Sequence, residues 1–513
     1  MEPRFFDLTR QERRAVTAGV MVGIFLAAME STVVATAMPS IVARLGGLEV
    51  YSWVFSSYLL TSTVTVPLWG KLSDLYGRRP FYLVGIGLFL VGSVACGFSR
   101  TMTQLILFRG LQGLGAGAVL PLGLTIVGDI YPLEARARIQ GLFSGVWGVA
   151  SIAGPFLGGF LTDHLSWRWV FFVNVPVGLV TSFIIGRFLR EPHRERVGSG
   201  RVDFLGGAVL IVALVLLLLG VMGTGWNGQG RLGLMAGAVV GLVVFVWMQR
   251  RAVDPMIPLG LFGNRIFLAS FVTGLLAGMA MFGAISFIPL FVQAILGTDA
   301  TAAGSVLTPF MLAWVVCSIV GARLLLHQNV RSIVLAGGVG LSVGFLLFTR
   351  LGVASTRPEV MVAMTVGGAG MGLMMAPLLI AVQSAVPRSQ LGVATSVTMF
   401  SRTIGGAIGV ALLGAVMVRV LRGEIMNLVG RTADLGLRPF VQNPEVLLQP
   451  AVRAGLPPSL VVGLQGALSQ ALHGVFLVGF GIALLALVST FLLPEGLARD
   501  HALSEGPVVP KRR

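Results

Sequence analysis

Fourteen long apolar runs constrain this chain more than any other feature of its sequence. A helix needs about 20 mostly apolar residues to cross the hydrocarbon of a bilayer. The runs lie near residues 15–38, 51–70, 81–98, 103–130, 137–161, 168–189, 203–222, 232–249, 266–292, 302–326, 332–349, 359–385, 390–418 and 468–493. Only 11% of the residues are charged, against about 25% in a soluble domain. The sequence therefore predicts an all-α polytopic membrane protein that crosses the bilayer fourteen times.

Positive charge is concentrated on one side of the predicted bundle. An even number of spans places both termini on the same side, and the segments on that side carry most of the 37 Lys and Arg residues. By the positive-inside rule, both termini are predicted to be cytoplasmic, in a multi-pass protein of the cell membrane. The same bias accounts for the net charge of +16, so no nucleic-acid partner is expected. Cys96 and Cys317 fall inside apolar runs and are predicted to be core residues.

A weak internal repeat relates the first six of these runs to the last six. Glycines and prolines recur at an offset of 255 residues, such as Gly113 with Gly368 and Pro132 with Pro387. Two related bundles with a cavity between them are typical of one large class of transporters. The predicted order is a six-helix bundle at 1–189, a cytoplasmic linker at 190–202, two inserted helices at 203–250, a second six-helix bundle at 251–498 that includes a long outer loop at 419–467, and a cytoplasmic tail at 499–513. In the outer loop we expect short amphipathic helices or a simple spacer.

The loop after the second run combines small and charged residues in a way that a merely basic loop would not need. Its residues are Gly70, Asp74, Gly77, Arg78 and Arg79. Gly70 would let helix backbones approach closely, and Asp74 would neutralise Arg78 or lie at a helix amino terminus, where the dipole favours a carboxylate. Because such contacts can form and break when two bundles move, we predict a conformational latch in this loop.

The spacing of this loop resembles a signature of the major facilitator superfamily, Gly-x-x-x-Asp-x-x-Gly-Arg-Arg/Lys, at every signature position. Residues 109–113 resemble the helix 4 motif of that family, Arg-x-x-Gln-Gly, and residues 145–159 resemble its antiporter motif. With fourteen spans and the stretch 167–176, the chain is identified as a member of the fourteen-helix drug:proton antiporter branch. The resemblance implies the major facilitator fold, two six-helix bundles plus two inserted helices, and adds Asp129 to the latch.

Glu30 lies in the middle of the first apolar run, where the family usually has aspartate. An ionised carboxylate at that depth costs at least about 2.5 kcal/mol, so Glu30 should be paired or be neutral part of the time. Arg109 is the candidate partner, because counting 1.5 Å per residue places both in the outer half of the membrane. The resemblance makes the first and fourth helices neighbours. We predict that Glu30 and Arg109 carry proton coupling; a structural ion pair without a role in turnover is the alternative.

A glycine-rich patch closes the fifth apolar run. It contains Gly154, Pro155, Gly158 and Gly159. Proline removes one backbone hydrogen bond, and glycine admits a neighbouring helix closely. We predict a bendable packing surface here, with a static seam as the alternative.

The predicted substrate cavity is lined by apolar, aromatic and a few polar side chains. The candidates are Met29, Gln112, Phe143, Trp147, Phe282, Phe310, Met371 and Arg402. Soft apolar walls suit lipophilic ligands, although most such residues in a membrane bundle face lipid or neighbouring helices. Arg402 has no accompanying acid in the second bundle, which disfavours divalent organic cations and leaves neutral, amphiphilic, anionic or singly cationic compounds.

These patterns favour a proton-coupled exporter of hydrophobic small molecules, acting as a monomer in the lipid bilayer without a cofactor. An exporter of an endogenous lipid or secondary metabolite is the main alternative. A facilitator without coupling and a membrane enzyme are two further alternatives. The five histidines are scattered, and no HExxH, paired-acid or Walker pattern is present. The sequence therefore predicts neither an enzyme, nor a metal site, nor ATP-driven transport.

Overall fold

The computed structural model describes residues 8–131, 133–190, 203–222, 228–252, 255–325, 327–386, 390–432 and 458–495. Within these ranges the regular structure consists of helices, without strands. The first set is α1 (Arg10–Leu45), α2 (Tyr51–Tyr76), α3 (Arg78–Phe98), α4 (Met102–Ile130), α5 (Leu133–His164), α6 (Trp169–Phe172) and α7 (Asn174–Phe188). Then come α8 (Phe204–Met222), α9 (Gly228–Arg251), α10 (Arg265–Ala294), α11 (Ala300–Leu324), α12 (Val330–Phe348), α13 (Arg357–Ser384), α14 (Leu391–Thr432) and α17 (Pro458–Ser489).

The predicted all-helical membrane fold is confirmed. Each of the fourteen apolar runs coincides with a helix, and the run 168–189 is divided between α6 and α7. Twelve spans in the described residues are long and apolar enough to cross a membrane, with α6 and α7 together forming one of them. The other two runs correspond to α2 and α5, which are 26 and 32 residues long. The fourteen-helix prediction therefore agrees with the fold.

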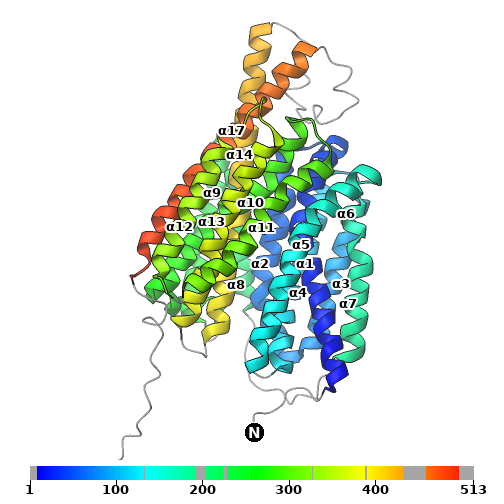
Figure 1. Cartoon of the computed structure of the whole chain (residues 1–513), viewed down its shortest axis with the longest axis vertical. Helices are drawn as coiled ribbons and strands as arrows, with labels where there is room; N and C mark the ends of the chain where they lie inside the picture. The colour runs from blue at the N-terminus through cyan, green and yellow to red at the C-terminus, as the bar shows by residue number, and fades with distance from the viewer. Residues whose placement is uncertain are drawn as a thin grey trace, which may run out of the picture.

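The predicted extent of the outer loop, 419–467, is wrong at both ends. α14 continues to Thr432 and α17 already begins at Pro458, and both helices project beyond the rest of the bundle at the top of Figure 1. Residues 459–467 of the predicted loop are thus the first part of α17 itself. The rest of that loop, 433–457, lies outside the described residues.

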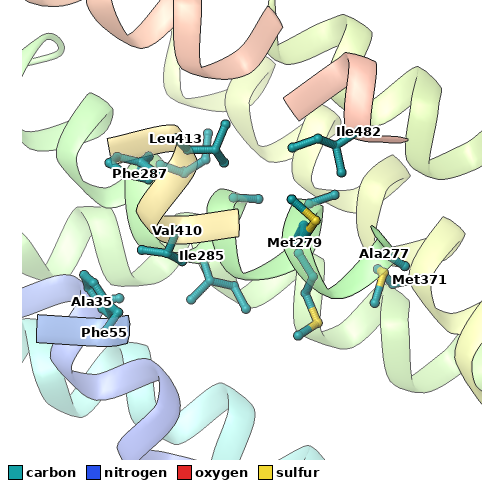
Figure 2. Packing of buried hydrophobic residues seen from close by; sticks show 14 of the residues in the cluster. Ala35, Phe55, Ala277, Met279, Ile285, Phe287, Met371, Val410, Leu413 and Ile482 are labelled. Carbon is teal, nitrogen blue, oxygen red and sulfur yellow. The ribbon is translucent and has the colours of Figure 1, made fainter. Parts of the chain in front are cut away.

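Helices α1–α7 (blue to cyan) lie on one side of the molecule and α10–α17 (green to red) on the other (Figure 1). Of the inserted pair, α8 contacts α2 and α14, while α9 packs mainly on α8. We call the end at which α1 begins the inner end, after the predicted orientation, and the opposite end the outer end. One buried apolar cluster connects the two sides, with Ala35 and Phe55 near Phe287, Val410 and Leu413 (Figure 2).

Asp163, at the outer end of α5, closes the outer side by binding the first turn of α11. Its carboxylate accepts hydrogen bonds from the backbone N–H of Ala300 at 3.1 Å and of Thr301 at 2.8 Å. The Thr301 hydroxyl donates a third at 2.6 Å. The first amides of a helix have no partner within the helix and carry a partial positive charge, so a carboxylate satisfies them well. The first set of helices thereby caps a helix of the second set.

Further polar contacts join the two sides near the same end. The Tyr51 hydroxyl donates to the Ser286 carbonyl at 2.6 Å, and the Gln293 side chain donates to the Thr36 carbonyl at 2.8 Å. An ion pair connects Glu49, before α2, with Arg422 of α14. Because these contacts engage the outer parts of their helices, the outer side is closed in this structure.

The glycine patch of α5 is packed against two helices. A Cβ atom on Gly154 would collide with Thr32 of α1, and one on Gly158 would collide with Thr36 of the same helix. Gly159 faces the other way, where a Cβ atom would collide with the backbone of Thr301 in α11. The close approach that the sequence predicted is therefore present. The helix runs unbroken through Pro155, and bending there stays a prediction.

We expect Gly159→Val to oppose closure of the outer side, because its side chain would meet backbone atoms that cannot turn away. Double electron–electron resonance between spin labels at the outer ends of α5 and α11 should show a population shifted to longer distances. Gly145→Val is the matched control, since a Cβ atom at that position of α5 meets no described atom within 4 Å. Unchanged distances in Gly159→Val would show that the seam does not govern closure.

Candidate functional site

A buried polar cluster lies inside the first set of helices. Glu30 comes from α1, Ser93 from α3, Arg109 and Gln112 from α4, and Asn174 from α7. Glu30 is 0% exposed and Arg109 is 1% exposed. Charged side chains inside a membrane bundle are costly unless they pair with one another, so the contacts within this cluster decide whether it is tolerated.

Both carboxylate oxygens of Glu30 are occupied. Oε1 forms an ion pair with Nη1 of Arg109, and Oε2 accepts a hydrogen bond from Nδ2 of Asn174 at 2.6 Å. The structure thus brings together the two residues that the sequence paired by depth. The carboxylate is held by a cation from α4 and by a neutral donor from α7, so loss of its charge would remove the attraction to Arg109.

Arg109 is held by more than its ion pair. Nη1 also donates to Oε1 of Gln112 at 2.7 Å, and Nε donates to the Val54 carbonyl of α2 at 3.2 Å. The guanidinium carbon lies 4.0 Å from the ring centroid of Tyr58, also in α2. A cation over an aromatic face is stabilised by the ring quadrupole. Arg109 therefore connects α1, α2 and α4.

Asn174 reaches the cluster because the sixth apolar run is broken. α6 ends at Phe172 and α7 begins at Asn174, and Pro176, in the first turn of α7, has no amide N–H to continue a helix from the preceding turn. The break leaves the Phe171 carbonyl free to accept a hydrogen bond from Ser93 at 2.9 Å. Ser93 in turn accepts from Nδ2 of Asn174 at 2.9 Å. A local break in the backbone thus orients the neutral partner of Glu30.

Sequence reasoning did not assign Asn174, Ser93 or Tyr58 to this cluster. Asn174 lies in the stretch that supported the family resemblance, and its amide is a polar group in an otherwise apolar run. That polarity was the available signal, because a buried amide needs hydrogen-bond partners. Its partner could not be identified without the arrangement of α1, α3 and α7.

The predicted cavity residues lie in different surroundings. Gln112 is fully buried and belongs to the Glu30 cluster in this conformation. Met29, Phe143, Phe310 and Met371 are buried among apolar neighbours, as most such residues in a bundle are. Phe282 is partly buried and touches both apolar clusters, and Arg402 borders a small cavity in the second set. The side chain of Trp147 lies outside the described residues.

The latch residues make their described contacts within the first set of helices. Arg78 forms an ion pair with Asp129 of α4 at 3.2 Å and donates to Ser73 at 2.6 Å. Arg79 donates to the Gly186 carbonyl of α7. Arg78 and Arg79 therefore join the start of α3 to the inner ends of α4 and α7, as expected for Asp129. The side chain of Asp74 lies outside the described part of the chain.

The two latch glycines differ. Gly77 separates α2 from α3 with φ of 104°, a conformation that side chains rarely adopt, so glycine is required there. Gly70 makes no close helix contact in this conformation, because a Cβ atom there would meet no described atom within 4 Å, and the close approach expected for it stays a prediction. Its place near the inner end of α2, away from the closed outer side, explains the absence of a tight helix contact.

Among the described residues no group of three or more His, Cys, Asp or Glu side chains is arranged to hold a metal ion. The cluster around Glu30 offers one carboxylate, one guanidinium and two amides. Its chemistry is that of proton binding and charge pairing.

Comparison with known proteins gives the family. The profile of the Major Facilitator Superfamily matches residues 20–410. The chain belongs to this superfamily. It is 36% identical to multidrug transporter protein MdtP of Bacillus subtilis, over 96% of this chain and 95% of that protein. It is 34% identical to multidrug resistance protein 3 of the same organism, over 95% and 96%.

A solved structure with the same fold is that of a bacterial homolog of the human lysosomal transporter Spinster, in an inward-facing and unoccupied conformation. It covers 96% of this chain and 98% of its own length, with a TM-score of 0.68 and 15% sequence identity. A likeness at this identity concerns the fold alone. The chain is thus a multi-pass membrane protein with a transporter fold, as the sequence predicted.

We expect Arg109→Gln to lower the stability of the folded protein, because it leaves the Glu30 carboxylate buried without its cation. Breaking a buried pair on one side costs about 3–5 kcal/mol. The double variant Glu30→Gln with Arg109→Gln carries no buried charge and should recover at least half of the loss. Thermal unfolding of purified protein in detergent, followed by tryptophan fluorescence, measures both effects. Equal losses in the single and the double variant would contradict the ion-pair explanation.

Proposed function

We propose that this protein exports lipophilic or amphiphilic small molecules by alternating access and that proton entry through Glu30 drives the export. Relatives at 34–36% identity are named as a multidrug transporter and a multidrug resistance protein. More distant relatives, at 29% identity, are named as efflux pumps of fungi. These names support transport over the membrane-enzyme alternative. In this proposal the protein is a monomer in the cell membrane with both termini in the cytoplasm.

The observation that carries the coupling proposal is the burial of Glu30 in a charge pair. Glu30 is the one acidic residue of the fourteen apolar runs that lies away from a run's ends. It is 0% exposed in this outward-closed conformation. A proton that binds Glu30 would remove its charge and with it the attraction to Arg109. Protonation can therefore change how α1 is held against α4.

The helix that carries Glu30 also carries part of the outer closure. Thr36 lies six residues further along α1, about 9 Å at 1.5 Å per residue. Its carbonyl accepts from Gln293 of α10, and its side chain faces Gly158 of α5. A shift of α1 after protonation would thus reach contacts on both α5 and α10. These contacts give a physical route from Glu30 to the packing of α1 against α5 and α10 at the outer end.

Asn174 supports both charge states of Glu30. Its Nδ2 donates to the carboxylate, whereas its Oδ1 is buried and has no hydrogen-bond partner in the described part of the structure. An amide can turn to present either end. After protonation, Oδ1 could accept the new O–H of Glu30. Asn174 would then keep the acid form satisfied while Arg109 is released.

The test is transport in proteoliposomes under an imposed pH gradient, with three fluorescent dyes: one cationic, one neutral and one anionic. We expect uphill transport of at least one dye by the parent protein and its loss in Glu30→Gln, because the amide cannot exchange a proton. Dye binding should persist, since Gln occupies the same volume. Glu359→Gln is the control, as Glu359 lies in the first turn of α13 and forms a capping box that Gln can keep.

Uphill transport by Glu30→Gln at the parent rate would disprove coupling through this residue. Downhill movement alone in the parent protein would favour a facilitator instead. If no dye is moved while a membrane lipid or secondary metabolite is, export of an endogenous product becomes the function.

A further inference from the structure

The second set of helices contains a small cavity in its interior. Its volume is about 40 Å³, and it lies between α10, α13 and α14. Its polar lining comes from α10 and α14, and its lining from α13 is apolar. The lining residues that bear on its chemistry are Ser270 and Gly274 of α10, Met375 and Leu378 of α13, and Thr398 and Arg402 of α14.

Arg402 forms no ion pair with any residue that the structure describes. Its Nε is buried and has no hydrogen-bond partner among the described residues. The guanidinium carbon lies 6.0 Å from the ring centroid of Trp314, a weak contact for a full charge. Within α10–α14 and α17 the sequence has only two acids, Glu359 and Glu424, both near the outer ends of their helices. The charge of Arg402 is therefore left for a group that is not part of these helices.

Ser270 supplies a second unused donor to the same cavity. It is completely buried, and its hydroxyl forms no hydrogen bond with a described residue. Side chains of a helix lean toward its amino terminus, so Arg402 leans from the level of Gly278, which its carbonyl contacts, toward the inner end of α14. Ser270 lies two turns nearer the inner end of α10 than Gly278. The two donors thus converge on one side of the cavity.

Buried polar groups in native proteins are almost always hydrogen-bonded. Two unpartnered donors at one cavity, one of them a cation, match an acceptor with negative charge. Glu30 cannot fill this role in the described conformation, because both of its oxygens already bind Arg109 and Asn174. A cationic substrate would be repelled by an unneutralised guanidinium.

We propose that Arg402 and Ser270 bind the anionic head group of the transported molecule and that the substrates include amphiphilic organic acids with a single carboxylate or similar group. Guanidinium is suited to planar, bidentate recognition of carboxylate. The cavity has room for such a head group, while Met375 and Leu378 offer an apolar surface to the start of its tail. This inference rests on the proposed export function and names the substrate class for it.

The test uses the full chain in nanodiscs of uncharged phosphatidylcholine, with 11-(dansylamino)undecanoic acid as the acidic probe and its methyl ester as the neutral one. Dansyl fluorescence reports the binding of each. We expect Arg402→Gln to weaken binding of the acid by about tenfold, as for a charge pair that has lost one partner. Binding of the ester should change less than twofold. Ser270→Ala should weaken the acid alone by a smaller factor, and Arg402→Lys should restore part of the loss.

Arg265→Gln is the matched control, since Arg265 is an exposed arginine at the inner end of α10. It removes the same charge from the protein without touching the cavity, so acid binding should stay at the parent value. Thermal unfolding of each variant establishes that it is folded. A chloride titration, with gluconate as the inert anion, tests whether the site takes small inorganic anions instead.

Equal loss of acid and ester binding in Arg402→Gln would overturn the proposal, as would unchanged acid binding. Displacement of the probe by chloride but not by unlabelled decanoate would also overturn it, because the site would then hold an inorganic ion. These outcomes are separate from the fate of the proposed export function. If Glu30→Gln still abolishes uphill dye transport while Arg402→Gln leaves acid binding unchanged, coupling holds and only the substrate class is wrong.

Discussion

The ion pair between Glu30 and Arg109 is the interaction on which the first set of helices depends. Neither charge is tolerable alone in a hydrocarbon environment, and the pair is accepted because Asn174, Gln112 and the Val54 carbonyl satisfy the remaining donors and acceptors. Because the buried charges are tolerated only with these partners, the contacts fix how α1, α2, α4 and α7 lie relative to one another. The proposed proton coupling follows from the same arrangement, because a neutral Glu30 would no longer attract Arg109.

Closure at the outer end depends on a different kind of contact. Membrane helices gain little from apolar burial against one another, because lipid tails are equally apolar. Van der Waals contact through close backbone approach stabilises the packing instead, with Gly158 of α5 against α1 and Gly159 against α11. Asp163 adds a charged cap on α11 that can be broken without leaving buried charge behind, because the Asp163 side chain is exposed. α1 belongs to both systems, which links the proton site to the closure.

The two sets of helices differ in the surroundings of their buried arginines, Arg109 and Arg402. Arg109 is enclosed by a carboxylate, an amide, a carbonyl and an aromatic ring, whereas Arg402 faces a cavity with an unpartnered hydroxyl nearby. Among the described residues, one charge is balanced by a carboxylate and the other is not. This difference supports the two proposals above, charge switching in the first set of helices and ligand recognition in the second.

The amino-acid sequence by itself determined the number of spans, the need for Glu30 to find a partner and the absence of an acid to accompany Arg402. These features depend on hydropathy and composition along the chain. Only the tertiary structure decided that Asn174 and Ser93 complete the Glu30 cluster, that Gly159 faces α11 while Gly158 faces α1, and that Gly70 makes no tight contact. The reason is the solvent. In water, the polar face of a helix reveals which side is buried, but in a bilayer lipid and core are both apolar, so the rotation of each helix about its axis leaves little trace in its sequence.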